Sequence, residues 1–218
     1  NNFSYRQVFA NFYLRLGKKD EAIQEMKKAS SINPMGLWGF LQDMSAFIAD
    51  PMELQSMVPQ TAESLRQFSQ FLASRGRKGG AIGVLERAVL IAPQDEQTIK
   101  MLVAAYRENG QKDKAIALLQ RTIGKGIVTA ELHSLLGGLY ADDGQRDKTI
   151  AEYRRALTMD PSDIRSYSSF VSFYRKLREK QKAEEVLKEG IEKNPESGIF
   201  FLELARFYRE ERMWMESL

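Results

Sequence analysis

The chain has 218 residues, of which 43% are hydrophobic and 28% are charged, and its formal net charge is +3. This composition is too apolar for a disordered chain, and its apolar runs are too short for a membrane-spanning helix of about 20 residues. The charge is weaker than a dedicated nucleic-acid-binding protein would carry, so no nucleic-acid partner is expected. The absence of cysteine excludes disulfides, thiolate metal ligands and a cysteine nucleophile.

The first predicted element is a helical hairpin within residues 3–34. Small and apolar residues recur there at helical spacing, including Phe9, Ala10, Tyr13, Ala22 and Ala29. A glycine follows the first predicted helix and a proline follows the second, where such residues commonly end helices. These two residues are Gly17 and Pro34.

Residues 35–61 follow a weaker pattern. A helix over residues 37–49 is predicted from one apolar face, and prolines then interrupt it. The face consists of Phe40, Met44 and Phe47, and the prolines are Pro51 and Pro59. One interpretation is an irregular, shortened repeat that keeps a helical stack continuous. The other is a kink or an adaptable contact site, because four of the nine methionines lie between Met35 and Met57.

From residue 62 onward a hairpin pattern recurs every 34 residues. Glycine follows the first helix, a small residue allows the two helices to cross closely, tyrosine fills space between hairpins, and proline follows the second helix. Residues at equivalent positions of successive units, which we call columns, are as follows: the glycines Gly76, Gly110 and Gly144; the small residues Ala81, Ala115, Thr149 and Ala183; the tyrosines Tyr106, Tyr140, Tyr174 and Tyr208; and the prolines Pro93, Pro161 and Pro195. Repeat units are predicted to start at Phe3, Ala62, Glu96, Ala130, Ile164 and Gly198. Arg178 stands where a turn glycine is expected.

The last register, from Gly198, holds one predicted helix from Ile199 to about Arg212. Met213, Trp214 and Met215 then fall where a turn and a second helix belong. End repeats usually show a polar outer face, so this apolar cluster predicts self-association through the C-terminal end. The alternative is that Trp214 packs on its own hairpin. We also expect the chain to be a piece of a longer array.

These columns resemble the tetratricopeptide repeat family, whose units are antiparallel helix pairs of about 34 residues. The units from Phe3 and Ala130 match closely, whereas the unit from Ile164 departs at Val171 and Gly190. The resemblance implies an all-α fold: a right-handed superhelical solenoid of antiparallel helix pairs that covers residues 1–218 as one domain. It also implies a non-catalytic scaffold for other proteins.

In this family four positions of each first helix line the concave inner surface. The resemblance places there Arg66, Gln70, Lys100, Arg107, Glu131, Ser134, Gly138, Arg165, Ser168, Ser172, Arg175, Arg206 and Arg209. Basic residues outnumber acidic ones in this set, which predicts a groove for a protein or peptide segment that is acidic, phosphorylated or ends in a carboxylate. The alternative is an ordinary helical surface that shows its charges to water.

The sequence predicts no catalytic, metal or cofactor site. His133 is the only histidine, and its place in the repeat predicts a structural role. The glycines between Gly76 and Gly83 lack the Gly-Lys-Ser/Thr ending of a phosphate loop. The basic run over residues 175–182 fits a helix end and turn, where cations are favoured.

Two further functions stay open by analogy with the family. The turns at residues 110–115 and 144–149 have the composition of bacterial members, which often serve cell-envelope, polysaccharide or secretion assemblies. Whichever function holds, we expect a soluble segment, cytoplasmic or periplasmic, with no direct membrane insertion. The second alternative is a region that regulates an enzyme fused outside these residues.

Overall fold

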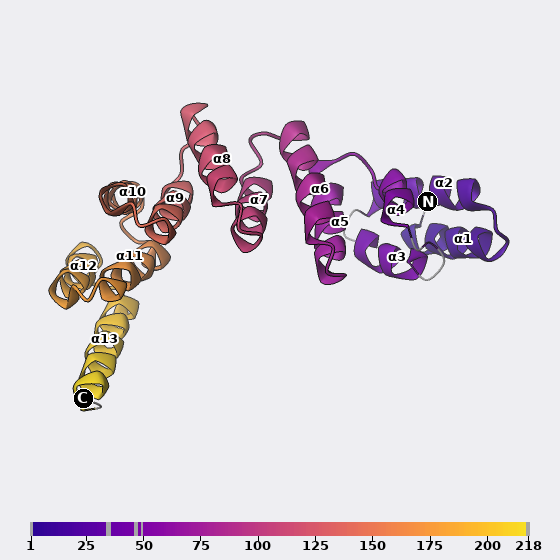
Figure 1. The fold of residues 1–218 in the computed structure, drawn as a ribbon. Helices are drawn as coiled ribbons and strands as arrows, with labels where there is room; N and C mark the ends of the chain where they lie inside the picture. The colour runs from indigo at the N-terminus through magenta and orange to yellow at the C-terminus, as the bar shows by residue number, and fades with distance from the viewer. Residues whose placement is uncertain (1, 34–35, 46–47, 49, 217–218) are drawn as a thin grey trace. The chain divides into compact units, whose positions relative to one another are not determined.

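The computed structural model describes residues 2–33, 36–45, 48 and 50–216, with the side chains of all of these except residues 30, 31, 51, 52, 57 and 211–216. The regular structure of this part is helical, with no strand, which confirms the all-α prediction (Figure 1). No helix within it is long and apolar enough to cross a membrane. The chain divides into two compact units, residues 1–115 and 116–218, and the boundary falls within one helix.

The first unit contains two regular hairpins and an irregular pair of helices between them (Figure 1). α1 packs on α2 and α5 packs on α6, while α3 contacts both α1 and α5. The helices are α1 (Phe3–Arg15), α2 (Lys19–Ile32), α3 (Leu37–Met44), α4 (Pro51–Met57), α5 (Ala62–Ser74), α6 (Lys78–Ile91), α7 (Glu96–Glu108) and the start of α8 (Lys112–Gly124).

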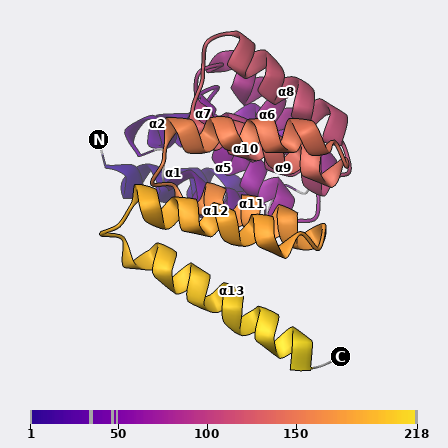
Figure 2. The ribbon, with the colours of Figure 1, turned by 90° about the vertical axis from the view of Figure 1, so that its left-hand side faces the viewer.

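The second unit contains the rest of α8, two hairpins and a last single helix. α9 pairs with α10 and α11 with α12, and α13 packs against both α12 and α11 (Figure 2). The helices are α9 (Ala130–Asp142), α10 (Arg146–Met159), α11 (Ile164–Lys176), α12 (Lys180–Lys193) and α13 (Gly198–Glu216).

Six helices begin at the residues where the repeat units were predicted to start: α1, α5, α7, α9, α11 and α13. The last of them begins at Gly198, one residue before the Ile199 predicted for its helix. Local capping explains why several of them begin there. Thr61, Thr129 and Asp163 each stand before a first helix, and each side chain accepts a hydrogen bond from a backbone N–H of the first turn. Such caps satisfy donors that a helix start leaves unpaired.

Small residues allow the two helices of each hairpin to approach closely. Five side chains of one column, early in the second helices, are fully or almost fully buried: Ala22, Ala81, Ala115, Thr149 and Ala183. Thr149 fits because its hydroxyl donates to the backbone carbonyl of Gln145 at 2.9 Å. On the facing helix, a Cβ added at Gly137 would lie 3.2 Å from the Tyr153 ring. The positions that hold small residues are therefore the points where the two helices of a hairpin touch.

The turn between the helices of a hairpin requires a left-handed backbone. Gly17, Gly76, Gly110 and Gly144 have φ between 72° and 74°, and Arg178 has φ 61° at the equivalent position. Glycine adopts this conformation without strain, whereas other L-residues do so at a cost of roughly 1–2 kcal/mol. Arg178 therefore performs the role of the turn glycine under local strain.

Replacing Arg178 by glycine should stabilise the protein by about 1 kcal/mol, because the strain at this turn is removed. Thermal unfolding should show a rise in Tm of about 2–4 °C. The matched change, Gly144→Ala, should lower stability by a similar amount, because φ there is 72° although no atom crowds the new Cβ. An unchanged Tm for both variants would contradict this explanation of the turns.

Residues 35–61 differ from the prediction in detail. The expected helix over residues 37–49 is too long, because α3 ends at Met44. Pro51 begins α4 instead of only interrupting a helix, as expected for a first helical position that needs no N–H. Phe40 and Met44 are buried as predicted, whereas Phe47 lies outside the described residues. α3 contacts α1 and α5, and α4 contacts α2. The interpretation of the segment as a shortened repeat stays a prediction.

The C-terminal helix is longer than predicted. A turn was expected at residues 213–215, but α13 continues to Glu216. No glycine or proline follows Arg212, and the residues there are good helix formers, so nothing local ends the helix. The side chains of Met213, Trp214 and Met215 lie outside the described residues, and self-association through this end stays a prediction.

Candidate protein-binding surface

α11 has one buried and one exposed face. The buried face holds Ser166, Tyr167, Phe170, Val171, Phe173 and Tyr174. The exposed face holds the four predicted residues of this helix and two more: Arg165, Ser168, Ser169, Ser172, Arg175 and Lys176. The two sets interleave at the three- and four-residue steps of a helix, so the α11 face, as we call the exposed set, is a continuous row.

A packed aromatic layer lies beneath the α11 face. The Phe170 ring lies 5.2 Å from Tyr153 and 4.8 Å from Tyr174, centroid to centroid. Burial, reinforced by the nearby carboxylate of Glu189, raises the pKa of Tyr167 to about 12, so its hydroxyl stays neutral in the core. The exposed serines and arginines are thus mounted on a well-packed support.

The two predicted arginines of α11 differ in their surroundings. The Arg165 side chain is 85% exposed, and its Nε lies 3.9 Å from an Asp163 oxygen. The Arg175 guanidinium donates to Glu210 at 2.8 Å and lies 6.0 Å from the centre of the Phe207 ring. Arg165 is therefore open to an incoming anion, whereas Arg175 also ties α11 to α13.

α13 continues the basic character in the second unit. Arg206 is exposed and pairs with Glu203 at 2.7 Å, and Arg209 is exposed as well. On the neighbouring α9, the half-buried Glu131, Ser134 and Gly138 occupy the predicted inner positions. The row of small and basic side chains on α11 is thus accompanied by two small residues and one acidic residue on α9 and by arginines on α13.

In the first unit the predicted residues do not form an equally basic row. Arg66 is only 18% exposed at its side chain and pairs with both Glu63 and Asp95, with a further bond to Thr98 at 3.2 Å. Two carboxylates thus balance its charge, and the side chain links α5 to the start of α7. Gln70 and Arg107 are exposed and Lys100 is half-buried.

His133 lies inside the α9–α10 hairpin. Its ring is buried, and Nδ1 is 2.5 Å from a carboxylate oxygen of Glu152, which also pairs with Arg155. This arrangement joins the two helices and offers no access to a substrate.

Two residues of the α11 face, Ser169 and Lys176, were not among the predicted inner positions. Each lies four residues after one of them, Arg165 and Ser172, so helical spacing alone would have found both.

Comparisons with known proteins agree with the repeat register. The tetratricopeptide repeat profile matches residues 4–34, and a second tetratricopeptide repeat profile matches residues 100–164. No curated protein sequence matches.

Solved structures share the fold. MamA is 23% identical, with a TM-score of 0.52 over 86% of this chain and 95% of that one. TTC0263 of Thermus thermophilus, a thermophilic repeat protein, is 19% identical, with a TM-score of 0.56 over 95% and 99%. YrrB, described as having an unusual peptide-binding site, is 17% identical, with a TM-score of 0.51 over 81% and 95%. These structures share the fold, and the two repeat profiles, with the hairpins, the turn conformations and the 34-residue register, show that the chain belongs to the tetratricopeptide repeat family.

Proposed function

We propose that this chain is a non-catalytic scaffold and that the α11 face binds an extended, acidic segment of a partner protein. The observation that carries the proposal is the exposed row of three serines with arginines near both ends, on a helix whose other side is fully packed. The 34-residue register continues unbroken from Glu96 to Gly198, which supports assigning residues 1–218 to a single repeat array.

The chemistry of the row suits such a ligand. Serine side chains are small, so an extended backbone can approach the helix closely, and their hydroxyls both donate and accept hydrogen bonds. Arginine binds carboxylates with paired, charge-assisted hydrogen bonds. Because these charges are exposed, each should contribute only about 0.2–1 kcal/mol, and binding should weaken as salt rises.

The double change Arg165→Glu with Arg175→Glu should weaken binding of a labelled ten-residue Glu/Ser peptide by about tenfold or more in fluorescence polarisation at low salt. The matched control is Lys188→Glu with Lys193→Glu, which changes the net charge equally on the exposed side of α12 in the same unit. The same measurement on the variant Lys100→Glu with Arg107→Glu tests whether these predicted groove residues of the first unit contribute to peptide binding. Circular dichroism checks the fold, because Arg175 also contacts α13.

Equal weakening by the α12 control would mean that the peptide responds only to overall charge. Unchanged affinity of the folded α11 variant would remove the α11 face from the proposal. Turnover that survives repurification in a hydrolase and transferase screen, and that a point mutation abolishes, would contradict the non-catalytic assignment.

A further inference from the structure

Arg178 is a strained residue in the turn between α11 and α12. In four other hairpins the residue with the left-handed backbone is glycine, with φ between 72° and 74°, whereas Arg178 has φ 61°. The Arg178 amide donates to the carbonyl of Arg175 at 2.9 Å, as the Gly144 amide does to Ala141 at 3.3 Å. The backbone of the turn is thus the same, and glycine would form it without the strain that a side chain meets there.

No contact within the described part of the chain offsets this strain. The Arg178 side chain is exposed, and no described residue accepts a hydrogen bond from it or pairs with its charge. The dipole of α11 favours cations in its last turn, which explains Arg175 and Lys176, but Arg178 lies beyond the end of the helix. Strained residues cluster at binding and active sites, so the strain is evidence that the Arg178 side chain serves a function.

The α11–α12 turn carries an excess of positive charge. Residues 175–182 contain five cations and one acid, whereas the equivalent residues 141–148 contain two cations and three acids. Lys176 and Arg178 are exposed and have no charged partner among the described residues. Leu177 stands between them and is 41% exposed. We call Lys176, Leu177 and Arg178 the turn triplet: two cations around one apolar side chain.

The one acid of the turn is already engaged. Glu179 accepts a hydrogen bond from Arg146 of α10 at 2.7 Å and pairs with Lys182 at 2.9 Å. The hydrogen bond from Arg146 and then that from Lys182 lower the pKa of Glu179 to about 2. Glu179 is therefore an anion committed to these two cations, and it leaves the charge of the turn triplet available to a ligand.

The turn triplet continues the α11 face. Lys176 belongs to both sets, and Ser172 precedes it by one helical turn. A ligand segment that runs along the α11 face toward the end of the helix therefore reaches the turn triplet next. Two cations around an apolar side chain complement a ligand sequence with two acidic residues around an apolar one.

The surroundings of the turn triplet favour a protein segment over other anionic ligands. Single-stranded nucleic acids stack their bases on exposed aromatic rings, but Phe173 and Tyr174 beside the turn are only 7% and 6% exposed. A membrane surface binds a broad apolar face, but Leu177 is the only apolar residue among residues 175–182.

We propose that the turn triplet is a second contact site for the protein ligand of the α11 face, and that it binds an acidic–apolar–acidic sequence, such as Glu-Leu-Glu, at one end of that ligand. The proposal rests on the function proposed for the α11 face. Arg178 binds a ligand carboxylate, which explains an arginine at a position where glycine is unstrained.

Two kinds of labelled peptide test the proposal in fluorescence polarisation at low salt. Both contain the ten-residue Glu/Ser segment; one carries the extension Glu-Leu-Glu after a Gly-Gly spacer and the other carries Ser-Ser-Ser. Each is made with the extension at either end, so that both directions of binding are tested. The wild type should bind the better Glu-Leu-Glu peptide about fivefold more tightly than its Ser-Ser-Ser counterpart.

The variant Arg178→Gly separates binding from stability. It should weaken binding of the Glu-Leu-Glu peptide by about threefold and leave the Ser-Ser-Ser peptide unchanged, although its Tm rises. A purely structural residue would give the rise in Tm alone. Arg178→Lys, which keeps the charge, should retain most of the affinity. The matched control is Lys125→Ser, which removes one exposed cation just after α8 in the same unit and should bind both peptides as the wild type does.

Failure of this proposal can be told from failure of the proposed function. Equal affinity of the wild type for the two peptides, unchanged binding by Arg178→Gly, or an equal loss in Lys125→Ser would overturn the turn triplet alone. A loss in Arg178→Gly without any loss in the Arg165→Glu, Arg175→Glu variant would support the turn triplet and remove the α11 face. No binding of any of these peptides by the wild type would overturn both.

Two other ligands give distinct results. Co-sedimentation with vesicles of phosphatidylserine and phosphatidylcholine that Arg178→Gly abolishes, with no gain from the Glu-Leu-Glu extension, would identify a membrane contact instead. Binding of a labelled single-stranded oligonucleotide with the same dependence on Arg178 would identify a nucleic-acid contact. Either result would overturn the assignment of a protein ligand to the turn triplet.

Discussion

Replacing Phe68 by alanine is expected to lower the free energy of unfolding by about 3–5 kcal/mol. The side chain is fully buried in the first unit, and its ring stacks near that of Phe71 at 6.3 Å between centres. The loss combines the transfer of the ring to water with the cavity that remains. Urea unfolding followed by circular dichroism measures it.

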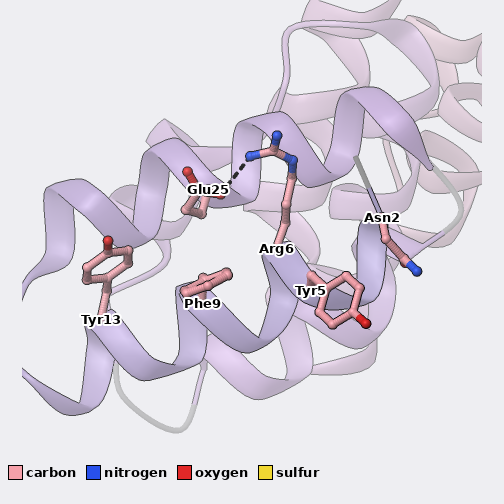
Figure 3. Close-up of a pocket in the computed structure, with 6 residues that line it drawn as sticks. All are labelled: Asn2, Tyr5, Arg6, Phe9, Tyr13 and Glu25. Atoms are coloured by element: carbon pink, nitrogen blue, oxygen red, sulfur yellow. Dashed lines mark hydrogen bonds and ion pairs between the residues drawn. The ribbon is translucent and has the colours of Figure 1, made fainter.

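The matched change is Phe9→Ala. Phe9 occupies the same position in the first repeat as Phe68 does in its own repeat, and both repeats belong to the compact unit of residues 1–115. The Phe9 side chain also lines a pocket beside α1 (Figure 3). Because the Phe9 ring is half exposed, its loss should change the free energy of unfolding by about 1 kcal/mol or less. Similar losses for the two variants would mean that Phe9 is covered in solution by something other than the described helices. This comparison therefore tests the exposure of Phe9 on α1.

Replacing Gly190 by alanine should destabilise the second unit by about 1–3 kcal/mol, although alanine is normally the better helix former. The added Cβ would lie 2.6 Å and 2.7 Å from two atoms of the Phe200 ring and 3.2 Å from Tyr167. Phe200 is itself buried and meets Tyr167 edge-on at 5.0 Å, so the ring cannot simply move into solvent. Thermal unfolding of the purified chain measures the effect.

Gly83→Ala is the control for Gly190→Ala. It lies within α6, where nothing approaches the added Cβ, so the same substitution should raise stability by roughly 0.5–1 kcal/mol. A double-mutant cycle adds Phe200→Ala. The loss in the double variant should be smaller than the sum of the single losses by about 1 kcal/mol or more, because the clash disappears with the ring. Additive losses would show that the two residues do not compete for space.

This competition for space accounts for the departure at Gly190 in the unit that begins at Ile164. The column of Gly190 otherwise holds Ala29, Ala88 and Ala156, with Thr122 in the remaining unit. Ten residues after Ala88 and Ala156 stand small polar side chains, Thr98 and Ser166, whereas Phe200 stands ten residues after Gly190. A large ring in the following helix has thus replaced the methyl group of the alanine.

The sequence by itself determined the features that depend on local interactions. The starts of α1, α5, α7, α9, α11 and α13 follow from a side-chain cap or a helical apolar period within a few residues. The left-handed turns follow from four glycines, and Arg178 shares their conformation because the hairpin around it requires one. The faces of α11 could be divided into buried and exposed by spacing alone.

Only the tertiary structure decided the features that depend on neighbours far along the chain. Arg66 seemed to belong to a basic groove until Asp95, 29 residues later, was found to balance its charge. Phe9 and Phe170 are indistinguishable in the repeat register, yet one is surface and the other core, because α10 lies over α11 and no described helix lies over α1. A periodic pattern states which face of a helix is apolar, but burial requires a second surface, and its identity is set by the three-dimensional arrangement of the helices.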